Sequence, residues 1–288
     1  MTSIVIAAHN EAAVIGRCLD AILSGAEPGE FDITVVANGC ADDTARVAAA
    51  RPGVRVLDLP APGKTSALNA GDAAARGFPR LYLDADVVIS AADVRTLVAA
   101  LRPGPREDGP LAVMPRRRLD LAGRPMLVRA FFAINARLPV YRDALFGRGL
   151  IVLSEQGRAR FDAFPQVIAD DLFLDSLFAS AEKVQVDAVT TTIATPRRTR
   201  DLVRRLVRVR AGNAAMRAAA SAGEAPSGVR ASARSSWLRD VVVPRPWLAP
   251  AAVCYVAITL TAAVAARRSG PGGPAWGHDE SSRVRVGD

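Results

Sequence analysis

The first hundred residues predict an α/β fold: a Rossmann-like α/β/α sandwich with a mostly parallel central sheet, followed by a C-terminal helical appendage. Short, continuously apolar runs, typical of strands covered on both faces, alternate with stretches of helical periodicity. A repeated strand–helix–strand order implies right-handed crossovers between parallel neighbours. The predicted strands are residues 3–8, 32–38, 54–59 and 80–84.

Helical patterns fill the intervals between these strands. In residues 11–23, apolar side chains recur on one helical face, and Asn10 stands where an N-cap is expected. The remaining predicted elements are helices over 43–50, 65–76 and 91–101, a loop over 102–110, a strand over 111–115, a helix over 126–138 and a loop leading into a helix over 165–180.

Composition limits the classes of function. The chain has 288 residues, 50% of them hydrophobic, which is enough for a full domain plus an appendage. Its net charge of +8 suits phosphate-rich ligands, an anionic membrane surface or nucleic acid, although no nucleic acid is expected as a partner. Three dispersed cysteines argue against a zinc site and favour a reducing compartment. Because His9 and His278 are the only histidines in the sequence, carboxylates are the expected catalytic groups. No signal peptide is expected at the N-terminus.

Polar residues follow each predicted strand, at the edge where parallel sheets bind ligands. Asp84 and Asp86 leave a buried strand one residue apart, a pattern that can hold Mn2+ or Mg2+ against a diphosphate. Lys64 stands where a helix is expected to begin, which favours an anion site. His9 is interpreted as lining a nucleotide pocket or packing at the strand end. The alternatives are solvated acids at a strand end and a surface lysine.

Two familiar nucleotide-binding motifs are excluded. The segment Gly63-Lys64-Thr65 is similar to the end of a P-loop, but Asp58 stands where that motif needs its first glycine. No GxGxxG segment follows a predicted strand, which weighs against a dinucleotide-dependent oxidoreductase.

Taken together, four segments resemble family 2 glycosyltransferases of the GT-A fold. In the family's order they are similar to its P-A-x-N-E, D-D-G-S-x-D-x-T, G-K-x-x-A-L-N-x-G and D-x-D segments. They stand here at residues 7–11, 37–44, 63–71 and 84–86.

The resemblance implies a donor site and a divalent cation, Mn2+ or Mg2+. Asp86 is implied as the main metal ligand, with Asp84 facing the ribose or the metal. An uncharged Asn38 replaces an aspartate of the family pattern, so the identity of the base stays open. The implied donor-binding residues are Ala8, His9, Glu11, Asn38, Lys64 and Asp84.

A second pair of segments resembles the acceptor side of the same family. Residues 146–149 are similar to its glycine-containing acceptor loop, and residues 170–174 to its E-D-x-x-L segment. The resemblance implies that Asp171 is the catalytic base and Asp170 the acid before it. An ionised aspartate suits the task of taking the acceptor hydroxyl's proton. The alternative is a pair of acids that stabilise the first turn of a helix.

The C-terminal third predicts a basic amphipathic helix over 196–219, with Thr195 as its N-cap and Pro196 in its first turn. Such a helix can lie on anionic lipid, grip the donor diphosphate or pack with a solvated arginine face. Leu202, Val203, Leu206, Val207 and Val209 fall on one face, and Arg204, Arg205 and Arg208 on the other.

An apolar stretch over 248–266 follows a linker over 220–246. As a helix it would reach about 28 Å, enough to cross a bilayer. A single span, an in-plane anchor and a helix buried on the catalytic domain stay open. The predicted organisation is a catalytic domain over 1–195, with nucleotide-sugar binding over 1–100 and the acceptor side over 101–195, then the basic helix, the linker, an apolar helix over 247–268 and a polar tail over 269–288.

The expected function is transfer of one sugar from a nucleoside diphosphate sugar to a hydroxyl acceptor, with inversion and with a metal ion. The expected location is the cytoplasmic face of the plasma membrane, where lipid-linked acceptors for envelope glycans reside, or else the cytoplasm. A sugar-1-phosphate nucleotidyltransferase is one alternative, although it would want a glycine-rich loop where His9-Asn10-Glu11 stands. A non-catalytic membrane-associated protein on a transferase scaffold is the other.

Overall fold

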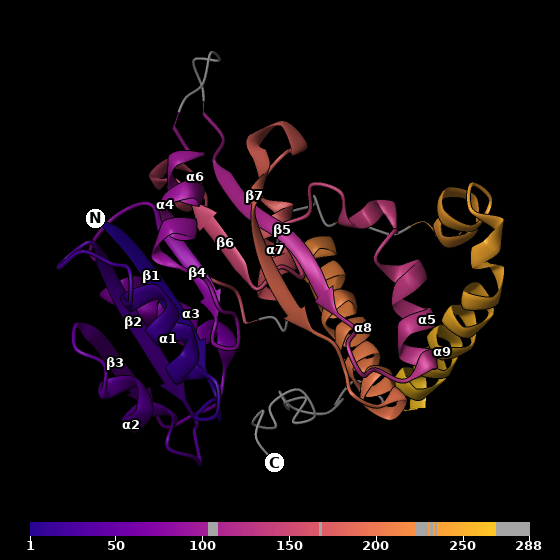
Figure 1. Cartoon of the computed structure of the whole chain (residues 1–288), viewed down its shortest axis with the longest axis horizontal. Coiled ribbons are helices and arrows are strands. Elements are labelled where there is room, and N and C mark those ends of the chain that lie inside the picture. The colour runs from indigo at the N-terminus through magenta and orange to yellow at the C-terminus, as the bar shows by residue number, and fades with distance from the viewer. Residues whose placement is uncertain (103–108, 167–168, 223–229, 231–232, 234, 269–288) are drawn as a thin grey trace. The chain divides into compact units, whose positions relative to one another are not determined.

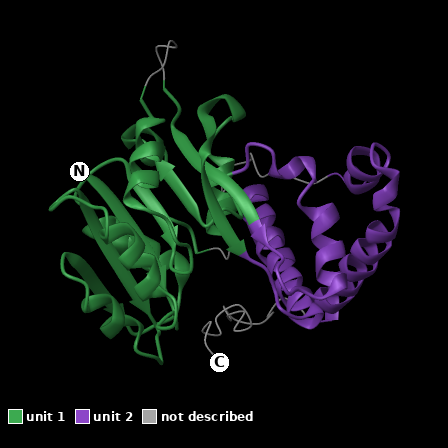
Figure 2. Cartoon of the chain, viewed as in Figure 1, with its two compact units in different colours: residues 1–118, 145–193 green, residues 119–144, 194–288 purple. Residues whose placement is uncertain are grey.

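The computed structural model describes residues 1–102, 109–166, 169–222, 230, 233 and 235–268 (Figure 1). The polar tail predicted for 269–288 lies outside the described residues, as do most of the loop predicted for 102–110 and part of the linker. The chain forms two compact units. Unit 1 comprises residues 1–118 and 145–193, and unit 2 comprises residues 119–144 and 194–288 (Figure 2).

Unit 1 is built on a seven-stranded mixed sheet with the strand order β3-β2-β1-β4-β6-β5-β7. Its first four strands in sequence are parallel to one another, whereas β6 is antiparallel to both β4 and β5. This mostly parallel arrangement confirms the predicted α/β fold. The strands are β1 (Thr2–Ala8), β2 (Phe31–Asn38), β3 (Val54–Leu59), β4 (Arg80–Asp84), β5 (Ala112–Asp120), β6 (Leu150–Leu153) and β7 (Lys183–Ala194).

Helices cover both faces of the parallel part of the sheet. Helices α1 (Ile15–Leu23), α2 (Thr44–Ala49) and α4 (Ala91–Ala99) contribute to one apolar cluster with the inward side chains of β1 and β2. Helix α3 (Lys64–Ala74) packs on the opposite face, where Val5 and Val36 point. A Cβ atom on Gly71 would lie only 2.4 Å from Val5 Cγ1, so a glycine permits this close approach.

Three further short helices belong to the second segment of unit 1, residues 145–193. They are α6 (Glu155–Arg158), α7 (Asp170–Ser176) and the short η2 (Ser180–Glu182). Strands β6 and β7 were not predicted. β6 has only four residues, all buried, and so shows no alternation from which a strand could be told from other buried chain.

Two predicted helix starts are wrong. The helix expected from Glu11 begins at Ile15, because Asn10 has a positive φ of 53° and its Oδ1 accepts a hydrogen bond from Ala41 N at 2.8 Å instead of capping a helix. The basic helix α8 (Thr199–Ser221) begins after the expected residue 196. Thr195, the expected cap, is fully buried and donates its hydroxyl to the carbonyl of Asp120.

Unit 2 is helical and has its own apolar core. Helices α5 (Met126–Asn135) and α9 (Ala249–Arg268) pack together, and the Phe131 and Tyr255 rings stack with centroids 5.2 Å apart. Helix α8 contributes Leu202 to the same core, whereas Val209, expected on its apolar face, is exposed. Three short helical turns lie in this unit: η1 (Pro139–Tyr141), η3 (Trp237–Val242) and η4 (Pro246–Leu248).

Among the described residues, one helix, over 246–268, is long and apolar enough to cross a membrane by length and composition alone. Its mean hydropathy over the best window is 2.0.

Candidate active site

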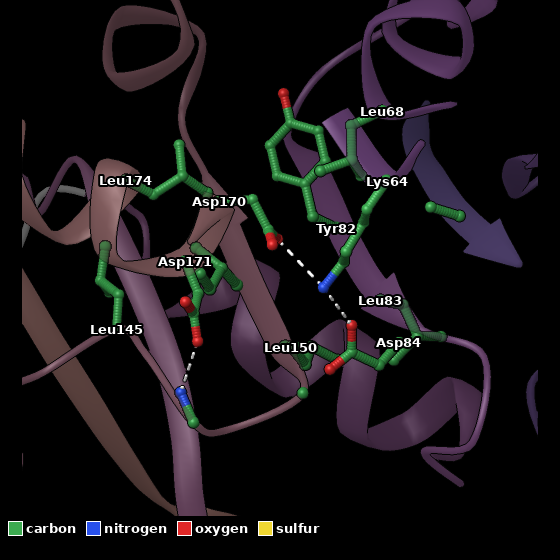
Figure 3. A pocket seen from close by; sticks show the side chains of 14 residues that line it. Lys64, Leu68, Tyr82, Leu83, Asp84, Leu145, Leu150, Asp170, Asp171 and Leu174 are labelled. Atoms are coloured by element: carbon green, nitrogen blue, oxygen red, sulfur yellow. Dashed lines mark hydrogen bonds and ion pairs between the residues drawn. The ribbon is translucent and has the colours of Figure 1, made fainter. Parts of the chain in front are cut away.

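A pocket in unit 1 lies where β1 and β4 end (Figure 3). It is lined by residues of β1, α3, β4, α7 and the segment 145–151. Four charged side chains face it: Lys64, Asp84, Asp170 and Asp171. The structure therefore brings together four of the site residues predicted from the sequence. They are Asp84 at the end of β4, Lys64 at the start of α3, and Asp170 and Asp171 at the start of α7.

Lys64 bridges carboxylates from different parts of the chain. Its Nζ donates to Asp84 Oδ1 at 2.9 Å and lies 3.1 Å from Asp170 Oδ2 (Figure 3). Burial by itself lowers the pKa of the ammonium, but the charges of Asp170, Asp84 and Asp171 more than offset burial and hold the pKa well above its ordinary value. Lys64 is therefore a fixed cation among three acids.

The two aspartates at the start of α7 have different surroundings. The Asp170 side chain is 14% exposed, and burial raises its pKa to about 6 against the lowering effect of Lys64, with Asp171 and Asp84 raising it further. Asp171 Oδ2 accepts a hydrogen bond from Gly147 N at 2.9 Å. One acid is thus paired with the lysine, and the other with the backbone of the glycine-containing loop.

That loop depends on two glycines with left-handed backbones, Gly147 at φ 70° and Gly149 at φ 69°. The carbonyl of Gly149 accepts a hydrogen bond from Asp84 N at 2.8 Å, and a Cβ on Gly149 would lie 2.4 Å from Val87 Cγ2. Arg148 between them is buried and donates to the Pro115 carbonyl at 2.8 Å. The predicted acceptor loop is therefore anchored directly beside the end of β4.

A positioning residue that was not predicted from the sequence is Asn69 of α3. Its side chain donates to the Phe164 carbonyl at 3.0 Å and accepts from Phe164 N at 2.7 Å. Gln166 also contacts this helix, since its Nε2 donates to Ser66 Oγ at 3.2 Å. These bonds hold the segment ahead of Asp170 against the helix that carries Lys64. The signal was present, because Asn69 belongs to the segment 63–71 of the family resemblance.

Asn38 has its side chain fully engaged within the protein. It is completely buried, its Nδ2 donates to the Ala8 carbonyl at 2.8 Å and the Val36 carbonyl at 3.3 Å, and its Oδ1 accepts from Gly63 N at 3.0 Å. Both amide hydrogens are used, so Asn38 braces the ends of β1 and β2 and the start of α3. Ala8 is completely buried, and neither residue lines the pocket of Figure 3.

His9 and Glu11 lie in the same corner of the sheet edge. The half-buried His9 ring donates from Nδ1 to the Asn38 carbonyl at 2.6 Å, which leaves Nε2 beside the Asn10 amide at 3.3 Å. Glu11 is buried, and its backbone N donates to Thr44 Oγ1 at 2.7 Å. Both adjoin the predicted nucleoside region without lining the pocket.

Asp86, unlike Asp84, Asp170 and Asp171, is not part of the pocket. It is exposed in the turn after β4. In the described part of the chain, no group of three or more His, Cys, Asp or Glu side chains is placed to hold a metal ion. Asp84 and Asp86 supply hard oxygen donors, which fit Mg2+ or Mn2+ when substrate phosphates complete the coordination. Their assignment as metal ligands stays a prediction.

The mostly parallel α/β sandwich, with acids and a lysine at the strand ends, agrees with the GT-A glycosyltransferase fold expected from the sequence. Residues 3–119 match the model of glycosyl transferase family 2, which confirms the family resemblance over this N-terminal part of the chain. No curated protein matches the chain.

Solved structures share the fold at low sequence identity. The mannosyltransferase PcManGT from Pyrobaculum calidifontis, in complex with GDP-Man and Mn2+, is 20% identical with a TM-score of 0.60, over 94% of this chain and 80% of that chain. Glucosyl-3-phosphoglycerate synthase from Mycobacterium tuberculosis, in complex with Mn2+, UDP and glucosyl-3-phosphoglycerate, is 24% identical with a TM-score of 0.56, over 76% and 79% of the two chains. These structures show that the fold is shared, and the family 2 match applies to residues 3–119.

Proposed function

We propose that this protein transfers one sugar from a nucleoside diphosphate donor to a hydroxyl acceptor, with inversion and with a divalent cation. The observation that carries the proposal is the convergence of Lys64, Asp84, Asp170 and Asp171 on one pocket at the strand ends. The family 2 match supports it, as do similar structures that hold GDP-Man or UDP together with Mn2+.

On the donor side, the chain supplies a cation and oxygen ligands. Lys64 lies in the pocket as an ammonium and compensates the negative charge of a departing diphosphate. Asp86, with Asp84, would hold Mn2+ or Mg2+, and such an ion supplies further charge neutralisation when bound with the donor. We assign the nucleoside to the corner formed by Ala8, His9, Glu11 and Asn38, where both amide hydrogens of Asn38 are already used within the protein.

On the acceptor side, Asp171 is the proposed base. The hydrogen bond from Gly147 N orients its carboxylate beside the glycine-containing loop. The acceptor hydroxyl gives its proton to Asp171 while its oxygen forms a bond to the anomeric carbon, and the bond from that carbon to the diphosphate oxygen breaks. Attack opposite the leaving group inverts the anomeric centre. Asp170 holds Lys64 in place rather than moving a proton.

The proposed acceptor and location are based on the apolar helix of unit 2. We assign a lipid-linked acceptor at the cytoplasmic face of the plasma membrane, because a long apolar helix is part of the chain that also carries the pocket. The family 2 match disfavours the alternative of a sugar-1-phosphate nucleotidyltransferase. The four charged residues that converge on the pocket disfavour the alternative of a non-catalytic protein on a transferase scaffold.

The test begins with a donor screen. Thermal shifts with GDP- and UDP-sugars, with and without Mn2+, identify the donor, and transfer to a hydroxyl acceptor is then measured. We expect Asp86→Ala and Asp171→Asn each to lower kcat at least about 100-fold with little loss of stability, because each removes a group used in the chemistry. Normal turnover in either variant would remove that residue from the mechanism.

The matched control is Asp162→Asn, which makes the same chemical change at an exposed aspartate just ahead of α7. It should leave turnover unchanged. The anomeric configuration of the product, read by proton NMR, tests inversion separately. A retained configuration would contradict the role of Asp171 as a base that activates the acceptor.

A further inference from the structure

Helix α9 carries a continuous apolar stripe on its outer face. At 100° per residue, Pro250, Val253, Ala257, Leu260 and Val264 fall within one narrow sector of the helix. The structure exposes this sector, since Val253 is 71% exposed, Leu260 60% and Val264 46%. We call these five residues the outer stripe. Large aliphatic side chains gathered on one exposed face mark an interaction surface.

The opposite face of α9 is already used. Ala252, Ile258 and Ala262 are buried, and the helix packs on α5 and α8 of the same unit. The outer stripe is therefore distinct from the core of unit 2. Both faces of α9 are apolar, and one of them is buried against other helices of unit 2.

Arginines stand at both ends of the helix that carries the outer stripe. Arg267 continues the same sector at the C-terminal end of α9, and Arg268 beside it is also exposed. Arg239 and Arg245 precede the helix. Within residues 235–268, all of them described, Asp240 is the single acid. Trp247 is 72% exposed, and tryptophan is enriched in the headgroup region of membranes.

A transmembrane orientation conflicts with the packing of α9 on α8. Arg210 of α8 donates from its guanidinium to the carbonyl of Thr259, which lies near the middle of the apolar segment, at 3.3 Å. If this segment crossed a bilayer while packed on α8, the Arg210 charge would lie near the centre of the hydrocarbon layer, which is strongly unfavourable. A helix lying in the plane of the interface keeps the arginine among headgroups and buries only the outer stripe.

The geometry points to the outer stripe as a docking surface for an anionic lipid bilayer, with α9 lying in the membrane plane rather than crossing it. Apolar side chains enter the acyl boundary, and the flanking arginines contact acidic headgroups. This inference rests on the membrane location in the proposed function but not on its sugar chemistry.

The test is co-sedimentation of the full-length protein with vesicles of phosphatidylglycerol and phosphatidylcholine, compared with phosphatidylcholine alone. We expect at least tenfold tighter binding to the anionic vesicles, weakened by 500 mM NaCl. The double variant Val253→Asp with Leu260→Asp should lose at least tenfold in affinity. The control Val184→Asp changes an exposed apolar side chain of β7 in unit 1 and should bind as the natural protein does. Circular dichroism verifies that each variant is folded.

Two results would overturn the inference. Retention of the natural protein in membranes after alkaline carbonate extraction would show that the helix crosses the bilayer. Equal binding by the double variant would show that the outer stripe does not contact lipid. A dimer in light scattering that the double variant abolishes would instead assign the stripe to a second copy of the chain. Donor-dependent thermal shifts measured on the same samples report separately on the proposed activity.

Discussion

At the scale of single residues, the site depends on one lysine shared between acids that are distant in sequence. Lys64 reaches Asp84 at 2.9 Å and Asp170 at 3.1 Å, and its pKa stays well above the ordinary value although burial opposes this. An ammonium held this way offsets the repulsion between carboxylates that would otherwise face each other across the pocket. In the proposed function, the same cation interacts with the diphosphate of the donor.

The Asp170 carboxyl predicts a pH dependence. Burial raises its pKa to about 6, with Lys64 of α3 lowering it and Asp171 and Asp84 raising it. Below pH 6 the protonated acid no longer offers its charge to Lys64, so kcat/KM should fall as the pH drops through about 6. In Asp170→Asn this transition should be absent and kcat/KM lower throughout. The measurement is the pH profile of sugar transfer from pH 4.5 to 8.

The sign of the linkage separates this effect from unfolding. Because the pKa of Asp170 is higher in the folded chain than in the unfolded chain, the folded state binds more protons between about pH 4 and pH 6. This group alone therefore makes the protein more stable, not less, as the pH falls through that window. Superimposable profiles for the natural protein and Asp170→Asn would show that Asp170 does not control the transition.

At the scale of elements, α3 links the fold to the site. One end of the helix carries Lys64, its middle carries Asn69, which holds the backbone of Phe164, and Gly71 lets it pack directly on β1 and β2. The motif over residues 63–71 therefore packs α3 on the sheet, in addition to its proposed role in ligand binding. Its spacing places the charged residue at the strand ends while the helix lies flat on the sheet.

Gly71→Ala tests this role of α3. The new Cβ would lie 2.4 Å from Val5 Cγ1, so the helix must move off the sheet. We expect a cost of about 1–3 kcal/mol from overpacking, larger than the gain of about 1 kcal/mol from helix propensity. Urea unfolding measures the change. The control Ala73→Ser, at an exposed position of the same helix, should change stability by less than about 0.5 kcal/mol, and equal effects would contradict the packing argument.

At the scale of the whole molecule, two units have separate apolar cores. The core of unit 1 lies between the sheet and α1, α2 and α4, whereas that of unit 2 joins α5, α8 and α9. Separate cores are compatible with the proposal that unit 1 binds the donor and unit 2 contacts the membrane. Such a division assigns different ligands to different parts of one chain.

Hydrogen exchange followed by mass spectrometry tests this division. Mn2+ with the nucleotide found in the donor screen should protect unit 1, above all the peptides that contain Lys64, Asp84 and Asp171, because the lining residues of the pocket belong to that unit. Anionic vesicles should instead protect α9. Protection of α9 by the nucleotide, with no change around the pocket, would contradict the assignment of the donor site to unit 1.

Much of the parallel half of the sheet could be predicted because strands buried on both faces have continuous apolar runs in the sequence. The runs at residues 54–59 and 80–84 coincide with β3 and β4, and the polar residues after the strands mark the ligand edge. The part of the sheet that contains β6 and β7 was predicted less well, and two helix starts were predicted wrongly. β6 is too short for its period to be read, and Asn10 and Thr195 use their side chains in distant contacts instead of capping helices.

By itself, the sequence determined the alternation of strands and helices, the sheet edge at which polar residues gather and the family to which residues 3–119 are matched. Only the tertiary structure decided that Lys64 joins Asp84 to Asp170, that Asn38 is used as a brace, and that α9 has one buried and one exposed apolar face. Local periodicity records whether a residue is buried, because burial repeats with the turn of a helix or the pleat of a strand. It does not record which distant residue the buried or charged group meets, since that depends on how the whole chain closes on itself.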